Sequence, residues 1–399
     1  MSVGSNNDIP VIAILHAYQP PTQTSKILER IVKNCYLPVA KCLENNPELK
    51  ISLNINASLS ELLEDDYLVV IEKYAELARN SQVEFLESGA YHPILPLLSQ
   101  KEAKMQIEMN RKINSRIFGS VWSPRGFWPP ELAVSETLAT LVESLGYEYL
   151  IVPEVALSSN TPFPSVLFTR IPVHPSAPNL ALINRNREIS NNISFKSYKF
   201  FQELKDHFAH LRSIQPNGNI IFATDLETFG EHHPGYEKFL NKILTSHKSK
   251  TISEILCMPK QPIIELRSSS WSTSEEDLYR DIPYPLWAYP GNSIHELLNF
   301  HSDLLSEAVE YLLLKKEETD LSVKMALKAV AKAQYSCQTW WASAKDHFSK
   351  ELIQKGFSAQ QSALELTLMA IDSESKYSIT KGISNRLEKR LERYLARLR

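Results

Sequence analysis

The chain has 399 residues, of which 43% are hydrophobic and 22% are charged, and this is the composition of an ordinary soluble globular protein with a sizeable core. Lys and Arg total 43 against 46 Asp and Glu, so the formal net charge of -3 creates no field that would attract a polyanion, and we expect no nucleic-acid partner. Only 11 residues are glycine and neither GxGxxG nor GxxxxGK followed by Ser or Thr occurs, which excludes a glycine-rich phosphate loop.

The first residues, MSVGSNND, lack the basic region of a secretory signal, and the apolar run that follows at 11–15 is too short for a membrane span. We therefore expect a cytoplasmic protein without a membrane partner. The cysteines form no CxxC pair, and their spacing suits neither a disulfide framework nor a zinc site in a chain of this length. Four reduced thiols are expected, at Cys35, Cys42, Cys257 and Cys337.

Short apolar runs alternate with helical patterns through the first two thirds of the chain, which is typical of βα units around a parallel sheet. A long helix is predicted after the second run, because Ser58 and Glu61 fit a capping box and apolar residues then repeat at i+3 and i+4 spacing up to Tyr74. The strands are expected at residues 11–15, 51–55, 83–86, 126–128, 149–152, 180–183, 220–224 and 263–266.

Polar residues follow five of these runs at their carboxyl ends. His16 follows the first run, Asn56 the second, His92 the third, Glu131 the fourth and Asp225 the seventh. In a parallel βα barrel these ends converge on one face, where the connecting loops build the active site. The five side chains are therefore expected to meet although they are scattered along the sequence.

The pattern changes after about residue 290. Helices without intervening strands are predicted at residues 294–316, 321–346, 359–372 and 384–399. They indicate a helical bundle packed on the barrel, with a barrel domain at 1–290 and a helical domain at 291–399. The segment 259–290 contains Trp271, Trp287 and several tyrosines and prolines, and is expected to line the binding cleft rather than to act as a linker.

Two carboxyl groups have surroundings that suit nucleophilic or acid–base catalysis. Glu131 ends the string GFWPPE, in which two prolines fix the backbone just beyond a strand and Trp128 offers an aromatic face. Asp225 ends the β-rich part of FATDLETFGEHH. Either acidic residue alone is a weak signal, because most Glu and Asp side chains are solvated or cap helices. His232 and His233 invite a zinc interpretation, but adjacent side chains diverge and a third ligand is not evident.

Five strings resemble, in order and spacing, the conserved regions of glycoside hydrolase family 57. His16-Ala-Tyr-Gln-Pro is similar to the first region, usually His-x-His-Gln-Pro, and residues 87–95 (ESGAYHPIL) resemble the second. Phe-Trp-Pro-Pro-Glu131 resembles the third region and Asp225-Leu-Glu-Thr-Phe-Gly the fourth. Ser-Ser-Trp271, with the tyrosine-rich residues downstream, is similar to the fifth. Agreement of five ordered motifs is far more specific than any one of them.

The resemblance implies an α/β fold with a seven-stranded (β/α)7-type barrel followed by helices, and a retaining double displacement on α-glucosidic bonds without a metal or another cofactor. It implies that Glu131 forms the glycosyl-enzyme, that Asp225 is the acid/base, and that the partner is an α-glucan or a maltooligosaccharide. Glu227 is expected to orient Asp225 or a histidine. The residues expected at the sugar subsites are His16, Gln19, His92, Trp128, Glu227, His232, Trp271 and Trp287.

Some positions depart from the family pattern. Tyr18 replaces the common second histidine, His92 stands where some members have a glutamate, and the two prolines before Glu131 replace part of a longer hydrophobic string. Both carboxyl groups remain in place, so the departures concern specificity. We expect Trp271 or Trp287 to offer an aromatic platform for a glucose ring.

Three alternatives stay open at this point. Hydrolysis, 4-α-glucanotransfer and branching share the glycosyl-enzyme and differ in whether water or a sugar hydroxyl reaches it. A metal-dependent polysaccharide deacetylase would use Asp225 with the paired histidines, but would leave Glu131 without a role. A non-catalytic glycan-binding protein would keep the cleft, although both carboxyl groups are intact. The sequence does not indicate an oligomeric state.

Overall fold

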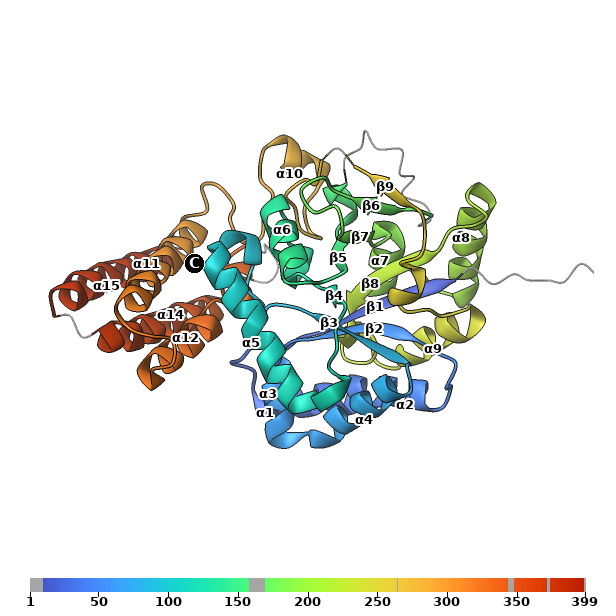
Figure 1. Ribbon diagram of the computed structural model, residues 1–399, viewed down its shortest axis with the longest axis horizontal. Helices are drawn as coiled ribbons and strands as arrows, with labels where there is room; N and C mark the ends of the chain where they lie inside the picture. The colour runs from blue at the N-terminus through green and yellow to red at the C-terminus, as the bar shows by residue number, and fades with distance from the viewer. Residues whose placement is uncertain (1–9, 158–168, 264, 344–347, 372–373, 398–399) are drawn as a thin grey trace, which may run out of the picture.

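The computed structural model describes residues 10–157, 169–263, 265–343, 348–371 and 374–397 (Figure 1). Its strands are β1 (Val11–Ala17), β2 (Ile51–Ile55), β3 (Val83–Glu87), β4 (Gly126–Phe127), β5 (Tyr149–Val152), β6 (Ile171–Val173), β7 (Ala181–Asn184), β8 (Ile220–Asp225) and β9 (Lys260–Pro262). Within the described residues, seven of them form one parallel sheet in the order β7-β5-β4-β3-β2-β1-β8, and β6 pairs with β9. The predicted (β/α)7-type barrel is confirmed.

Helices follow the strands and cover the outside of the sheet. In Figure 1 the first four helices lie on one side of the sheet and α6 lies on the opposite side. The helices of the barrel are α1 (Ser25–Ile31), α2 (Leu37–Glu44), α3 (Ala57–Asp66), α4 (Leu68–Arg79), α5 (Gln100–Phe118), α6 (Glu136–Ser144), α7 (Arg187–Ser194), α8 (Phe201–Ile214) and α9 (Glu237–Ser246).

The strands divide their side chains between the barrel interior and the outer helices. Ile12 and Ile14 of β1 belong to the apolar cluster inside the barrel, whereas the alternate residues of β1 pack under the helices. Because successive side chains of a strand point to opposite faces, His16 lies on the inward side with the two isoleucines. Gly126 has no side chain because a Cβ there would lie 1.8 Å from the ring of Tyr149.

The barrel is nearly closed between its two edge strands, β7 and β8. No ladder joins them in the described part of the chain. The residues that follow β7 reach β8 instead, since the backbone N–H of Asn186 donates to the Ile221 carbonyl at 2.7 Å. The guanidinium of Arg185 also donates to the Ala223 carbonyl at 3.2 Å. These bonds attach the residues after β7 to the middle of β8.

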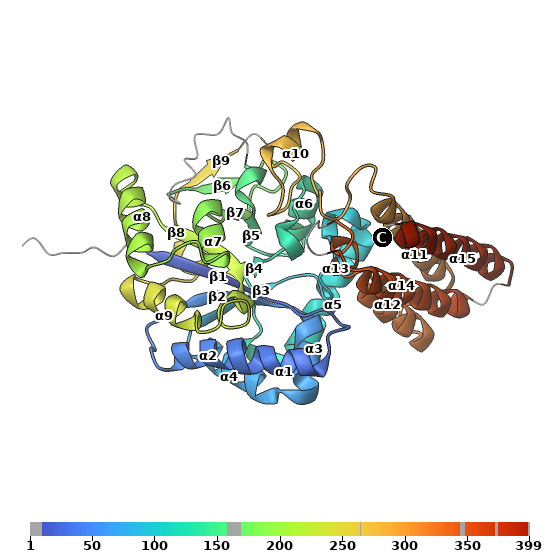
Figure 2. The ribbon, with the colours of Figure 1, turned by 180° about the vertical axis from the view of Figure 1, so that it is seen from behind.

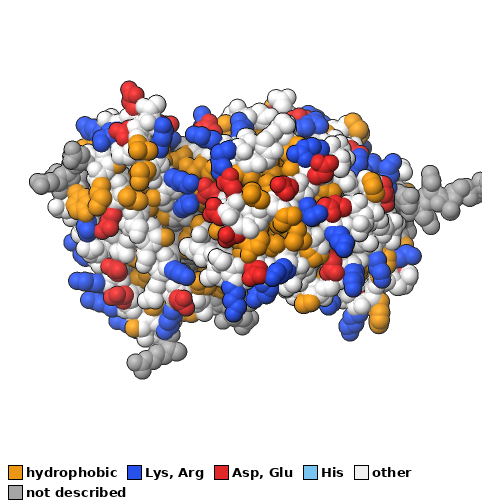
Figure 3. All heavy atoms as spheres, turned by 90° about the horizontal axis from the view of Figure 1, so that it is seen from below, with side chains coloured by type: hydrophobic (Ala, Val, Ile, Leu, Met, Phe, Trp, Pro, Cys, Tyr) orange, Lys and Arg blue, Asp and Glu red, His pale blue; other side chains and the backbone are white. Residues whose placement is uncertain are grey.

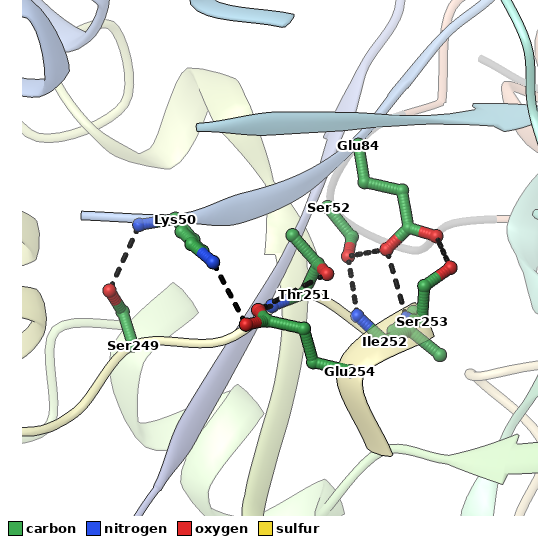
Figure 4. Close-up of polar contacts among 8 residues, drawn as sticks. All are labelled: Lys50, Ser52, Glu84, Ser249, Thr251, Ile252, Ser253 and Glu254. Atoms are coloured by element: carbon green, nitrogen blue, oxygen red, sulfur yellow. Dashed lines mark hydrogen bonds and ion pairs between the residues drawn. The ribbon is translucent and has the colours of Figure 1, made fainter. Parts of the chain in front are cut away.

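Residues 248–254 cover the amino-terminal end of the barrel (Figure 4). Glu84 of β3 accepts hydrogen bonds there from the hydroxyl of Ser52 at 3.2 Å and from that of Tyr149 at 2.6 Å. The carboxylate also accepts from the hydroxyl of Ser253 and, at 3.2 Å, from its backbone N–H. Donors from two strands and one loop therefore surround this carboxylate.

Every element described after Ser293 is a helix. Figure 2 shows α13 between the barrel and the long helices. Trp340 of this region packs against Ile94, Ala133 and Trp287 at the junction with the barrel. The helices are α11 (Ser293–Lys315), α12 (Leu321–Ala333), α13 (Cys337–Trp340), α14 (Lys350–Ile371) and α15 (Glu374–Arg397), and the short α10 (Glu275–Tyr279) precedes them.

Several predicted boundaries differ from the structure. The helix predicted at 321–346 ends at Ala333, because the chain turns toward the barrel and the N–H of Ser336 donates to the carbonyl of His92 at 3.0 Å. Residues 344–346 of that helix lie outside the described residues. The helices predicted at 359–372 and 384–399 begin earlier, as α14 and α15.

Two other local predictions are wrong. The cap of the helix after β2 is the Asn56 side chain, which accepts from the N–H of Leu59 at 3.4 Å, and that helix is divided at Tyr67 into α3 and α4. The run at 263–266 is not a strand, since β9 ends at Pro262 and Leu266 forms only an isolated bridge. Residue 264 is not among the described residues.

One face of the molecule shows no dominant charge. On the face drawn in Figure 3, Lys and Arg side chains alternate with Asp and Glu, and apolar side chains gather between them. No described helix combines the length and the apolar character that crossing a membrane requires. All four cysteines lie within the described residues and are free.

Candidate active site

Three polar side chains lie at one level across neighbouring strands. The register of the sheet pairs His16 of β1 with Asn54 of β2 on one side and with Asp225 of β8 on the other. All three lie at the carboxyl ends of their strands, which is the catalytic face of a βα barrel. Asn54 was not predicted, because a polar residue within a mostly apolar strand carries no motif; Asn56, which was expected at the site, caps α3 instead.

The rings of His16 and His92 contact each other at this site. The Nε2 atoms of His16 and His92 are 2.9 Å apart, and Nδ1 of His16 lies 2.7 Å from Oδ1 of Asn54. Burial lowers the pKa of His16 to about 4 and that of His92 well below its ordinary value, so both rings are neutral at pH 7. Both nitrogens of each ring have protein partners, the remaining one being Ser336 on Nδ1 of His92. Neither histidine therefore has a free nitrogen for a sugar hydroxyl, although the sequence had led us to expect both at the sugar.

Aromatic rings enclose the histidine pair. Tyr18 stacks on His92 with ring centroids 3.9 Å apart, and Trp128 stacks on His16 at 5.0 Å. Trp128 is 0% exposed and belongs to the apolar cluster inside the barrel. It does not offer the open sugar-stacking face that its sequence context predicted. The partly exposed ring is that of Tyr18, the residue that departs from the family pattern.

Glu131 lies in a strained turn after β4. Its φ of 58° and the φ of 47° at Leu132 are in the left-handed region, which L-residues with side chains rarely adopt. The two prolines before Glu131 restrict the chain on entry to this turn. The backbone N–H of Trp271 donates to the Glu131 carbonyl at 3.1 Å. The carboxyl group, 15% exposed, lies 3.8 Å from Nδ1 of His92.

The electrostatics of Glu131 and Asp225 are linked. Burial and, to a smaller extent, the charge of Asp225 raise the pKa of Glu131 to about 8, and a hydrogen bond from the Trp271 side chain opposes the rise. Burial also raises the pKa of Asp225, to about 6, against the lowering effect of Arg185. Between these values the two carboxyl groups hold a single proton. Such a pair is suited to one carboxylate acting as nucleophile while the other carboxyl group supplies a proton.

Arg185 was not predicted from the sequence. It follows β7, is buried, and its guanidinium lies 5.5 Å from the centre of the Trp271 ring. Desolvation lowers its pKa to about 10, so the side chain stays charged at neutral pH. Its charge favours the ionised form of Asp225. Nothing in its local sequence distinguishes it from a surface arginine.

Glu227 is held by the loop that follows β1. Its carboxylate accepts hydrogen bonds from the Tyr36 hydroxyl, from Gln19 Nε2 at 2.9 Å and from the backbone N–H of Tyr18 at 3.4 Å. Burial, followed by the charge of Asp225, raises its pKa to about 7. Gln19 and Glu227, both expected at the sugar, thus bind each other in the buried wall of the site. Glu227 holds the β1 loop, whereas it had been expected to orient Asp225 or a histidine.

Two residues expected at the sugar lie elsewhere. Trp287 is 0% exposed and packs with Ile94, Ala133 and Tyr284, so it is a core residue rather than a platform. His232 is exposed on the loop after β8, and only its backbone N–H, which donates to the Glu227 carbonyl at 2.9 Å, joins it to the described site. Trp271 is the tryptophan of the segment 259–290 that reaches Glu131.

Ser336, between α12 and α13, and Cys337, the first residue of α13, reach the site and were not predicted. Ser336 Oγ lies 2.9 Å from Nδ1 of His92. The thiol of Cys337 donates to the Tyr18 hydroxyl at 3.6 Å. The helical region therefore completes one wall of the site, and no sequence signal linked these two residues to the barrel motifs.

The described residues contain no group of three or more His, Cys, Asp or Glu side chains that could hold a metal ion. His233, one of the two adjacent histidines, binds the Ser194 carbonyl through Nε2 at 2.8 Å. His232 lies exposed beside it. The two side chains thus diverge, as adjacent residues were expected to do.

Comparison with known proteins points in one direction. The sequence profile described as glycosyl hydrolase family 57 matches residues 8–265. The chain is 28% identical over 140 residues to "Alpha-amylase 1" of Dictyoglomus thermophilum, which is 35% of this chain and 20% of that protein. It is 24% identical over 227 residues to the 4-alpha-glucanotransferase of Thermococcus litoralis, which is 56% of this chain and 33% of that protein.

The fold is also found among solved structures. The GH57-type branching enzyme of Pyrococcus horikoshii superimposes with a TM-score of 0.69 and 17% sequence identity, covering 94% of each chain. At this identity the likeness establishes the fold alone. The chain spans no more than a third of the length of the two sequence relatives described above, with 20% and 33% of each covered.

Proposed function

We propose that this chain, which belongs to glycosyl hydrolase family 57, breaks α-glucosidic bonds by double displacement, with Glu131 as the nucleophile and Asp225 as the acid/base. The observation behind this assignment is the linked pair of carboxyl groups at the carboxyl ends of β4 and β8. Both pKa values are raised by burial, and the charge of one carboxyl group raises the pKa of the other. We assign the α-glucan class from the family.

In the first step, Asp225 donates a proton to the leaving glycosidic oxygen while the Glu131 carboxylate attacks the anomeric carbon. The carbon–oxygen bond to the leaving sugar breaks as a β-glycosyl ester of Glu131 forms. In the second step, the Asp225 carboxylate takes a proton from water or from a sugar hydroxyl, which attacks the same carbon and releases Glu131. Two inversions return the α configuration.

These pKa values place the single proton of the free pair on Glu131, whereas the first step requires it on Asp225, so the proton must shift to Asp225 when the substrate binds. The hydrogen bond from the Trp271 side chain and the developing positive charge of the sugar both favour ionised Glu131 at that point. The neutral His92 brings no competing positive charge. We assign Tyr18 and Trp271, the partly exposed rings beside Glu131, to contact with the sugar.

Hydrolysis and transfer use the same intermediate, so the acceptor decides between them. The experiment is incubation of the purified chain with maltoheptaose and with starch, followed by separation of the products by length. Shorter reducing sugars alone would mean hydrolysis, and longer maltooligosaccharides would mean 4-α-glucanotransfer. New α-1,6 linkages, detected by debranching, would mean branching. An unchanged substrate would overturn the proposal.

A further inference from the structure

A continuous chain of hydrogen bonds runs behind Glu131. Ser336 Oγ lies 2.9 Å from Nδ1 of His92, and Nε2 of His92 lies 2.9 Å from Nε2 of His16. Nδ1 of His16 lies 2.7 Å from Oδ1 of Asn54, whose Nδ2 donates to the Leu86 carbonyl at 3.2 Å. The four side chains are buried, so water does not compete for these bonds.

The far end of this chain fixes its direction. A backbone carbonyl only accepts, so Nδ2 of Asn54 faces Leu86 and Oδ1 faces His16. His16 must then carry its proton on Nδ1, which leaves Nε2 as an acceptor. His92 must donate from Nε2, which leaves its Nδ1 as an acceptor for Ser336. Each neutral ring has one N–H, and the sequence of donors and acceptors has no break.

We infer that the Ser336 hydroxyl is the terminal donor of this chain, and that Ser336 is a positioning residue that fixes the His92 ring beside the nucleophile. The bond it makes occupies Nδ1 of His92, the nitrogen that lies 3.8 Å from Glu131. The inference rests on the proposed role of Glu131. It also gives the helical region a part in the reaction, since Ser336 belongs to the segment between α12 and α13.

Two further contacts make His92 dependent on this anchor. The backbone N–H of Ser336 donates to the His92 carbonyl at 3.0 Å, and the φ of His92 is 60°, a left-handed conformation that its surroundings must hold. Tyr18 stacks on the His92 ring, with the two ring centroids 3.9 Å apart. A displaced His92 would therefore move both Tyr18 and the surroundings of Glu131.

The first test is nitrogen-15 NMR of the full chain labelled at histidine, with the His16→Gln and His92→Gln spectra used for assignment. We expect opposite tautomers at pH 7, Nδ1–H for His16 and Nε2–H for His92. In Ser336→Ala, the Nδ1 signal of His92 should move toward that of an imine nitrogen without a hydrogen bond, while the His16 signals hold. Identical tautomers, or an unmoved His92 signal, would overturn the inference.

The second test is kinetic. Ser336→Ala should lower kcat on maltoheptaose about tenfold and change KM less than about twofold, because the ring beside Glu131 loses its anchor. Ser336→Thr keeps the hydroxyl and should restore most of kcat. Ser343→Ala, just after α13, is the matched control, since its hydroxyl donates to the Trp340 carbonyl at 2.7 Å and makes no bond to the site among the described residues.

The two proposals fail in different ways. An unchanged kcat in Ser336→Ala, with an active wild-type chain, would overturn the positioning role and leave Glu131 as the nucleophile. An inactive wild-type chain would overturn the proposed function, and the NMR spectra would still decide whether Ser336 is the donor to His92.

Discussion

Buried carboxyl groups lie at both ends of the barrel, but their surroundings differ. At the amino end, Glu84 accepts hydrogen bonds from Ser52, Tyr149 and Ser253, so its carboxylate is surrounded by donors. At the carboxyl end, Glu131 and Asp225 are buried with far less compensation, and their pKa values rise to about 8 and about 6. A carboxylate with its donors in place stabilises the fold, whereas one short of donors stays reactive.

The comparison is tested most directly by the same substitution, Glu to Gln, at both ends of the barrel. Glu131→Gln should reduce turnover of maltooligosaccharides by at least about a thousandfold, because no glycosyl ester can form, and should change stability little. Glu84→Gln should keep activity but lower the free energy of unfolding by about 1–3 kcal/mol, because an amide turns N–H groups toward donors. Initial rates measure the turnover of each variant, and chemical denaturation measures its free energy of unfolding. Loss of activity in Glu84→Gln with an intact fold would contradict the division of roles.

The pH dependence of the rate should follow the carboxyl end alone. Below about pH 6 both groups of the pair are protonated and the nucleophile is lost, and above about pH 8 both are ionised and the acid is lost. A bell-shaped profile of kcat/KM with limbs near these values is expected, with a fall of about tenfold per pH unit beyond each limb. Glu84→Gln should leave both limbs unmoved. A rate that keeps rising above pH 9 would contradict the need for a protonated acid.

The smallest expected effect on activity separates two tryptophans of one segment. Trp271→Ala should lower kcat/KM several-fold, since stacking on the sugar contributes about 1 kcal/mol, with little loss of stability. Trp287→Ala should instead destabilise the chain by about 3–5 kcal/mol, because a fully buried ring leaves a cavity. Thermal unfolding and steady-state kinetics of the two variants distinguish a substrate contact from a core residue. Equal losses of stability would mark Trp271 as a core residue too.

The barrel could be predicted from the sequence because each long strand is marked by a local run of apolar residues. Apolar runs located the strands β1 to β5, β7 and β8, and the ordered motifs placed His16, Glu131 and Asp225 on one face. The strand expected at 263–266 failed because an apolar run of four residues is also compatible with a buried loop. The short β6 and β9 carry no pattern that would reveal them.

The surroundings of the carboxyl groups were less predictable from the sequence, because they depend on contacts between distant segments. Aromatic residues in motifs were taken for sugar platforms, yet Trp128 and Trp287 fill the interior. Arg185 and Ser336 reach the site from outside the motifs, and their roles follow from burial and from partners that one sequence does not reveal. The composition of a motif identifies the chemistry, while the three-dimensional packing decides which side chains face the substrate.

The stereochemistry of azide rescue tests the assignment of Glu131 and Asp225 most directly. Glu131→Gly cannot form a glycosyl ester, so azide should displace fluoride from α-glucosyl fluoride in one inversion and give β-glucosyl azide. Asp225→Ala keeps the nucleophile, and azide should attack the ester in a second inversion and give α-glucosyl azide. Proton NMR of the two products distinguishes the anomers. The reverse pattern would exchange the two roles, and full activity of either variant on glucan would contradict the double displacement through this pair.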